Sequence, residues 1–199
     1  FCGTFLILFF AATGRVCLTL LGVGVFGAGA CASYYVFPHV RTRVEVWLDP
    51  WASYNAQGYQ IVQGLMALAS GGLFGVGLGN GMPEVIPASH TDYIFSVIGE
   101  EFGILFAAIV IVFYLVFIVR GMLIALDARE TYDALLVFGC TCMLSLQAFI
   151  IIGGVIKLIP LTGITLPFIS YGGSSLLSSM LQLGILEGVA IKNSRREEE

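Results

Sequence analysis

The chain has 199 residues, of which 58% are hydrophobic and only 11% are charged, and its formal net charge is −4. Soluble domains carry about a quarter charged residues, so this composition, with a mean hydropathy of +0.94, excludes an ordinary soluble domain. The sequence predicts an all-α polytopic membrane protein, in which lipid replaces water around most side chains. Three of the acids, Glu197 to Glu199, read as a solvated, disordered tail, and we expect no nucleic-acid partner.

Four apolar segments are long enough to cross a bilayer, which takes about 20 residues each. They cover residues 16–37, 98–119, 134–156 and 168–191 of a single membrane domain. Residues 1–12 form a shorter apolar run that predicts part of a further helix, so we expect an N-terminal portion of the parent protein to precede Phe1. Residues 38–97 remain as one large loop.

Basic residues indicate the orientation, because cytoplasmic loops are enriched in Lys and Arg. Six of them fall on the side of the C-terminus, namely Arg15, Arg120, Arg129, Lys192, Arg195 and Arg196. Three fall on the opposite side, namely Arg41, Arg43 and Lys157. The C-terminus is therefore predicted to be cytoplasmic and the large loop extracytoplasmic.

The large loop has a composition that is not low-complexity. Its aromatic residues, among them Trp47, Trp51 and Phe74, suit a re-entrant or interfacial element. Residues 58–69 alternate apolar and amide side chains in a way that favours a short amphipathic helix. Six glycines follow within residues 70–81, and they suit either a backbone that approaches a ligand closely or a flexible segment without one.

Two patterns are assigned structural roles. Residues 22–27 match the G-x-G-x-x-G dinucleotide fingerprint, but they lie inside a predicted span and suit a helix–helix contact better. The five cysteines lie in or beside apolar runs and are interpreted as small buried hydrophobes, with no disulfide framework.

The first polar group of the loop contains Arg41 and Arg43 together with Glu45 and Asp49. A planar guanidinium suits a pyrophosphate because it forms paired, charge-assisted hydrogen bonds. The alternative is an interfacial cluster of ion pairs at a helix exit. Asp49 precedes a proline and most simply begins a turn or a helix.

The second polar group is His90-Thr91-Asp92, preceded by Glu84, at the mouth of a predicted span. A carboxylate at a lipid boundary is costly to desolvate, so it is a candidate functional group and a candidate general base. The alternative is that Asp92 or Thr91 caps the helix that begins near Tyr93. Glu100 and Glu101 follow within that helix, where acids near an N-terminus are favoured without any catalytic role.

The third polar group is the segment 157–175, which contains two prolines and a Ser-Tyr-Gly-Gly-Ser-Ser run. Irregular backbone at membrane depth is tolerated only where it is buried in protein or lines a wet cavity. The segment therefore predicts a polar cavity, with Lys157, Ser170 and Ser174 as candidate substrate-binding residues.

In these motifs the chain resembles the C-terminal half of the SEDS proteins (shape, elongation, division and sporulation), the FtsW/RodA/SpoVE group. The resemblance follows the chain in order, through Trp47-Leu48-Asp49-Pro50, Gly58-Tyr59-Gln60, Gly71-Gly72, His90-Thr91-Asp92-Tyr93-Ile94-Phe95, Gly99-Glu100-Glu101-Phe102-Gly103 and the block from Pro160 to Ser175. There are departures. Many members have Pro-Glu before the His-Thr-Asp motif where this chain has Pro87-Ala88, and the family often has Asn where Ile151 stands.

The resemblance implies a bacterial glycosyltransferase of the cytoplasmic membrane that polymerises lipid II, serving elongation, division or sporulation. It implies a cognate class B penicillin-binding protein as the partner. It also implies that Asp92 is the catalytic base, while Arg41, Arg43, Lys157 or a divalent cation such as Mg²⁺ or Mn²⁺ stabilises the departing pyrophosphate. Glu84 and His90 are further candidate substrate-binding residues, and the fragment alone is expected to be inactive. A lipid-precursor flippase and a non-catalytic scaffold for the transpeptidase remain the alternatives.

Overall fold

The computed structural model describes residues 1–195, so Arg196 and the predicted tail Glu197–Glu199 lie outside the described residues. The described chain is all-α and without strands. Its helices in chain order are α1 (Cys2–Thr13), α2 (Val16–Val36), α3 (Pro38–Leu48), α4 (Gly58–Ser70), the 3₁₀ turn η1 (Pro83–Val85), α5 (Ile94–Asp127), α6 (Thr131–Val155) and α7 (Gly173–Arg195). This confirms the predicted fold class.

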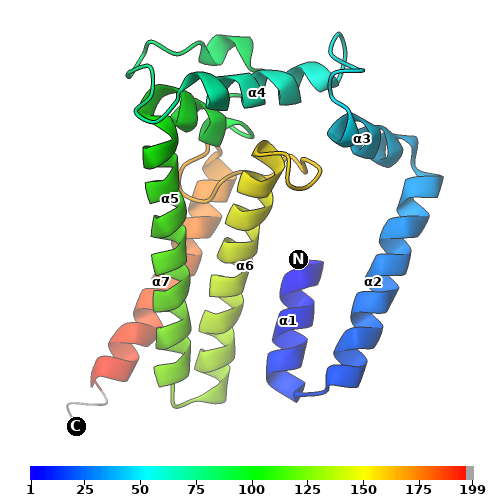
Figure 1. Cartoon of the computed structure of the whole chain (residues 1–199). Helices are drawn as coiled ribbons and strands as arrows, with labels where there is room; N and C mark the ends of the chain where they lie inside the picture. Colours follow the sequence, from blue (N-terminus) through cyan, green and yellow to red (C-terminus); the bar gives the residue numbers. More distant parts are fainter. Residues whose placement is uncertain (196–199) are drawn as a thin grey trace.

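Four helices, α2, α5, α6 and α7, are long and apolar enough to cross a membrane. They run from one end of the molecule to the other, while α3, α4 and the long connections gather at one end, which we call the loop end (Figure 1). Several boundaries differ from the predicted spans. Helix α5 extends past residues 98–119 on both sides, and α7 begins at Gly173 because residues 168–172 form turns after Pro167.

The larger of two core clusters lies between α5 and α6 toward the loop end, and a smaller one joins α5, α6 and α7 at the opposite end. In the larger cluster, Tyr93, Phe95 and Val110 pack with Ile151 and Val155 of α6. Most other large apolar side chains of the long helices are exposed, as expected for surfaces that face lipid. Helix α2 has no buried residue.

Two structural expectations from the sequence are met only in part. Of the glycines in residues 22–27, only Gly22 faces another helix of the described chain, through Leu6 of α1. Cys2, Cys17 and Cys31 are exposed rather than buried, while Cys140 and Cys142 are half-buried. All five are free thiols. The difference arises because an apolar sequence pattern does not distinguish a residue on the surface of a membrane-spanning helix from one buried against its neighbours.

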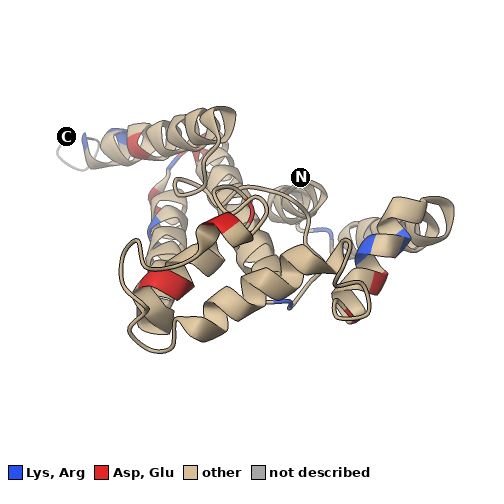
Figure 2. Cartoon of the chain, turned by 90° about the horizontal axis from the view of Figure 1, so that it is seen from above, with Lys and Arg blue, Asp and Glu red and all other residues tan. Residues whose placement is uncertain are grey.

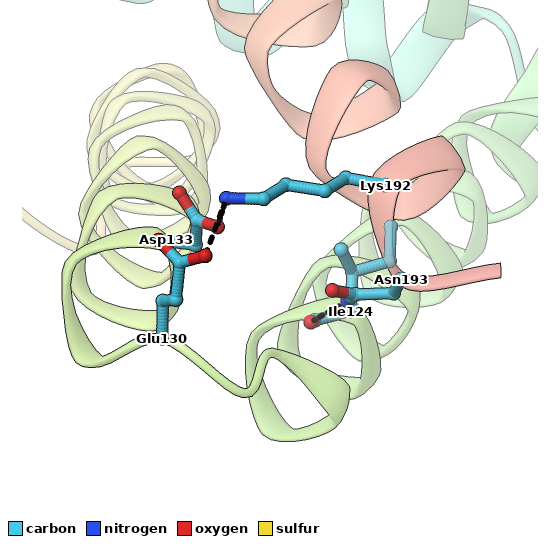
Figure 3. A network of polar contacts seen from close by, with 5 residues as sticks. All are labelled: Ile124, Glu130, Asp133, Lys192 and Asn193. Carbon is cyan, nitrogen blue, oxygen red and sulfur yellow. Dashed lines mark hydrogen bonds and ion pairs between the residues drawn. The ribbon is translucent and has the colours of Figure 1, made fainter. Parts of the chain in front are cut away.

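The end of the bundle opposite the loop end is held by a polar network (Figure 3). The ammonium group of Lys192 on α7 lies 2.6 Å from Asp133 Oδ2 and 3.0 Å from Glu130 Oε1. Next to it, Asn193 Nδ2 donates to the carbonyl of Ile124 at 3.3 Å. These contacts fix the C-terminal end of α7 to the connection between α5 and α6.

Helix α5 is broken at Gly103, whose φ of 83° and ψ of 172° are not helical. Residues 71–82, which we call the glycine loop, pair with the backbone on both sides of the break. The N–H groups of Val76 and Gly77 donate to the carbonyls of Glu100 and Glu101 at 2.9 and 3.0 Å. The N–H of Ile104 donates to the carbonyl of Gly72 at 2.9 Å. The loop therefore satisfies backbone groups that an intact helix would pair internally.

We expect Gly103→Ala to destabilise the protein by roughly 1–3 kcal/mol, because a side chain at this positive φ is strained. An ideal Cβ would also lie 2.4 Å from the carbonyl oxygen of Leu73 and 2.5 Å from the amide nitrogen of Gly75. The measurement is the thermal unfolding midpoint of the full-length parent protein in detergent. Gly184→Ala in α7 is the matched control, because a Cβ there meets no atom within 4 Å. Equal midpoints for both variants would contradict the assigned role of Gly103.

Candidate functional site

A cavity of about 380 Å³ lies at the loop end, between α3, α4, the start of α5 and the segment that follows α6. Its polar lining residues are His39, Arg43, Gln57, Gln60 and Asp92. Viewed down onto this end, the basic positions of α3 lie apart from the acidic positions on and near α5 (Figure 2). The cavity thus has one carboxylate, Asp92, and one guanidinium, Arg43, in its lining.

The backbone around Asp92 forms a tight turn that begins at Ala88, a non-glycine residue with a φ of 58°. The N–H groups of Thr91, Asp92 and Tyr93 all point to the carbonyl of Ala88, at 3.1, 3.1 and 3.3 Å. This turn ends where α5 begins at Ile94, and no side chain caps that helix end. The capping alternative for Asp92 and Thr91 is therefore not formed.

The turn is held in place from the segment that follows α6. Ser170 is buried, and its hydroxyl donates to the carbonyl of Thr91 at 2.6 Å and accepts from the N–H of Leu166 at 2.8 Å. The N–H of Tyr171 donates to the carbonyl of His90 at 2.9 Å. Two segments far apart in sequence therefore fix the backbone on either side of Asp92. This is a positioning contact for Ser170, whose hydroxyl is already engaged.

The carboxylate of Asp92 itself is half-buried and accepts no hydrogen bond from any residue within 1–195. Gly163 lies beside this carboxylate: a Cβ there would be 3.4 Å from Asp92 Oδ2, an ordinary contact, while its φ of 71° favours glycine. A carboxylate with a fixed backbone and unused oxygens is suited to accept a proton from a ligand.

Tyr93 forms the floor beside Asp92. Its side chain is fully buried, and an ideal Cβ on Gly64 of α4 would overlap the Tyr93 ring. Burial, and to a smaller extent the charge of Asp92, raises the pKa of the Tyr93 hydroxyl, which stays neutral at physiological pH. The glycine at position 64 therefore lets α4 pack directly against the Tyr93 ring.

The structure separates the two arginines of α3. Arg41 Nε lies 2.8 Å from Glu45 Oε1 on the exposed side of the helix, and this hydrogen bond and charge raise the pKa of the guanidinium. Arg43 lines the cavity with Asp92 and has no ion pair within the described part of the chain. Of the two arginines, only Arg43 thus lines the same cavity as Asp92.

The remaining candidates lie outside this cavity. Lys157 Nζ donates to the carbonyl of Leu48 at 3.3 Å, and its own carbonyl accepts from Trp47 Nε1 at 3.1 Å, so it joins α3 to the segment after α6. Glu84 in η1 and His90 in the turn are exposed. Neither of them lines the cavity.

A second cavity of about 640 Å³ lies between α1, α6, the segment that follows α6 and the start of α7. Ser174 lines it, and the lining contains no charged side chain. Gln147 Nε2 donates to the carbonyl of Thr165 at 2.9 Å, and Thr165 Oγ1 lies 2.6 Å from Ser175 Oγ. Gly163 lines both cavities, so they adjoin beside Asp92.

Sequence reasoning did not single out His39, Gln57 or Gln147. An amide within the predicted span 134–156 was the available signal for Gln147, because a polar side chain at membrane depth is a candidate functional group. His39 and Gln57 had no such signal, since both lie in a long polar connection whose folding decides which residues meet.

The first cavity offers few ligands for a divalent cation. Within residues 1–195 no group of three or more His, Cys, Asp or Glu side chains could hold a metal ion. The first cavity offers Asp92 and His39, whereas magnesium takes an octahedral set of oxygen ligands. The described residues of this cavity do not form a metal site by themselves.

Comparisons with known proteins place this site in context. A family model described as "Cell cycle protein" and labelled FTSW_RODA_SPOVE matches residues 1–195. Peptidoglycan glycosyltransferase RodA of Mycobacterium tuberculosis (strain H37Rv) is 44% identical over 187 residues, covering 94% of this chain and 40% of that protein. Stage V sporulation protein E of Bacillus subtilis (strain 168) is 37% identical over 196 residues, covering 89% of this chain and 54% of that protein.

A solved structure agrees with the fold. One of its chains superposes with a TM-score of 0.74 at 26% identity, covering 94% of this chain and 52% of that chain. That structure is described as "Structural coordination of polymerization and crosslinking by a peptidoglycan synthase complex". The present chain spans about two fifths to one half of the length of these relatives.

Proposed function

The chain belongs to the FtsW/RodA/SpoVE family of cell cycle proteins, and we propose that it carries the active site of a peptidoglycan glycosyltransferase that polymerises lipid II. The single observation that supports this most strongly is the Asp92 carboxylate. It is held by a fixed backbone, accepts no hydrogen bond from residues 1–195 and lines the same cavity as Arg43. The relatives named RodA are themselves peptidoglycan glycosyltransferases.

The proposed reaction is base-assisted glycosyl transfer. A sugar hydroxyl of one lipid-linked substrate attacks the anomeric carbon of another, and Asp92 takes the hydroxyl proton as the new C–O bond forms. The bond from the anomeric carbon to the pyrophosphate oxygen breaks, and undecaprenyl pyrophosphate leaves with inversion at carbon. Arg43 is placed to bind the negative charge that develops on the leaving pyrophosphate.

The two cavities suit different parts of this chemistry. The first cavity offers the guanidinium of Arg43, a group that suits a pyrophosphate. The second cavity is uncharged and carries hydroxyl and amide groups beside apolar side chains, which suits a sugar attached to a lipid. Asp92 stands where they adjoin at Gly163, so both substrates would reach the same carboxylate.

The proposal extends to the setting of the protein. A class B penicillin-binding protein is the proposed partner, which agrees with a solved relative described as part of a complex that couples polymerization and crosslinking. The loop end is proposed to be extracytoplasmic and the C-terminus cytoplasmic, because basic residues predominate on the C-terminal side.

Polymerisation by the full-length parent protein tests the function. We expect the parent, purified with its penicillin-binding partner and given labelled lipid II, to form long glycan strands. A polar cavity at membrane depth would also serve a flippase. Transfer of lipid II across vesicles without any strands would overturn the proposal in favour of transport. If neither activity is observed, the remaining function is that of a non-catalytic scaffold.

A further inference from the structure

The glycine loop exposes an apolar surface that no described residue covers. Leu73, Phe74, Leu78 and Met82 are 60%, 80%, 76% and 70% exposed. The sequence between Asp49 and Glu84 contains no charged residue and no histidine. Contiguous apolar surface of this kind is rare on parts of a protein that face water and marks contact with a membrane or with another protein.

The depth of the loop is set by its hydrogen bonds to α5. Its backbone pairs with Glu100, Glu101 and Ile104, so it lies level with the break at Gly103. Ile104 is also where a continuous apolar run of α5 begins, with 60% of its side chain exposed. The loop lies on the side of α5 away from α2 and α3 (Figures 1 and 2). Its apolar surface is therefore continuous with the lipid-facing surface of α5.

We infer that the glycine loop inserts into the bilayer leaflet at the loop end, at the boundary between headgroups and hydrocarbon. Phe74 and Leu78 would enter the hydrocarbon edge, while the paired backbone of the loop limits the desolvation cost of burying it. No side chain within residues 71–82 is charged, which favours lipid. The nearby carboxylates of Glu101 and Glu100 are engaged by the loop backbone, accepting from the N–H groups of Gly79 and Met82 at 3.2 and 3.3 Å.

Insertion would fix the roof of the first cavity relative to the membrane. Gly71 follows α4 and packs so closely on Gly99 of α5 that a Cβ would lie 1.9 Å from the Gly99 carbonyl oxygen. Helix α4 carries Gln60 and begins just after Gln57, both of which line the cavity. The inference does not depend on the proposed enzymatic reaction, since it concerns where the loop sits.

Spin-label accessibility tests the inference in the full-length parent. The protein, with its native cysteines replaced by alanine, is reconstituted into vesicles of phosphatidylcholine and phosphatidylglycerol. Single labels are attached to Phe74→Cys, Leu78→Cys and Met82→Cys variants. The accessibility of each label is then measured by power saturation, once with oxygen, which concentrates in hydrocarbon, and once with a water-soluble nickel chelate. Asn55→Cys is the matched control, since Asn55 is exposed in a polar turn of the same connection.

We expect the oxygen-to-nickel accessibility ratio at positions 74 and 78 to exceed that at position 55 several-fold and to approach that of an Ile109→Cys variant on the exposed face of α5. Ratios equal to that at position 55 would overturn the inference. Nickel access that is lost only when the penicillin-binding partner is added would also overturn it, and would assign the surface to a protein. Met82→Cys provides an independent reading if Phe74→Cys does not fold.

Discussion

Replacing Asp92 by Asn is expected to lower the rate of glycan-strand formation by at least about 100-fold, the contribution of a positioned general base. The side chain keeps its size but no longer accepts a proton. The hydrogen bonds that hold the turn, from Asp92 N–H to Ala88, from Ser170 to Thr91 and from Tyr171 to His90, involve no side-chain atom of Asp92, so the fold should be retained. The measurement is the initial rate with labelled lipid II, using the parent complex.

The matched control for this substitution is Asp127→Asn. It makes the same chemical change at an exposed carboxylate on the last residue of α5, at the opposite end of the bundle. The control should polymerise at the wild-type rate, and both variants should have the wild-type unfolding midpoint. A wild-type rate for Asp92→Asn would remove Asp92 from the reaction while leaving the family assignment intact.

Replacing Arg43 by Ala is expected to reduce kcat/KM for strand formation by roughly 10- to 100-fold, because a hydrogen bond to a charged group contributes about 1.5–3 kcal/mol. Arg43 lines the cavity beside Asp92 and is not engaged by an acid of the described chain. Arg41→Ala is the matched control from the same helix. Its exposed pair with Glu45 contributes little.

The difference in kcat/KM between the Arg43→Ala and Arg41→Ala variants tests whether Arg43 binds the leaving group. A loss confined to Arg43→Ala, partly restored in Arg43→Lys, supports binding of a phosphate group in the cavity. Equal losses for both variants would indicate a general effect of positive charge on α3. No loss for either would exclude this helix from leaving-group binding.

The sequence predicts the parts of the fold that rest on apolar length and pattern. The four long helices follow from runs that only lipid or a core can cover, and α4 follows from the alternation in residues 58–69. The break at Gly103 could not be predicted, because residues 94–127 read as one continuous apolar helix apart from a few polar positions. The partners that stabilise the break come from residues 71–77, which no local pattern connects to it.

The candidate site was also predictable only where a local pattern in the sequence pointed to it. Asp92 could be predicted as a functional residue because a carboxylate beside a membrane-spanning segment is costly to desolvate. The sequence did not distinguish Arg41 from Arg43. Which face of α3 lines the cavity depends on how α4 and the segment after α6 pack, and no local pattern reveals that packing. Ser170 stood out as a polar residue in a broken segment, yet its position against Thr91 depends on a contact between residues 79 positions apart.

The hydrogen bonds between the glycine loop and the break at Gly103 also constrain the order in which the protein can assemble. A break inside a helix at the membrane boundary leaves carbonyl and N–H groups that lipid cannot satisfy. The groups that pair with them belong to Gly72, Val76 and Gly77, which precede α5 in the chain. During synthesis these partners are therefore already available when residues 100–104 emerge. The interrupted helix can be completed as it is made, without waiting for α6 or α7.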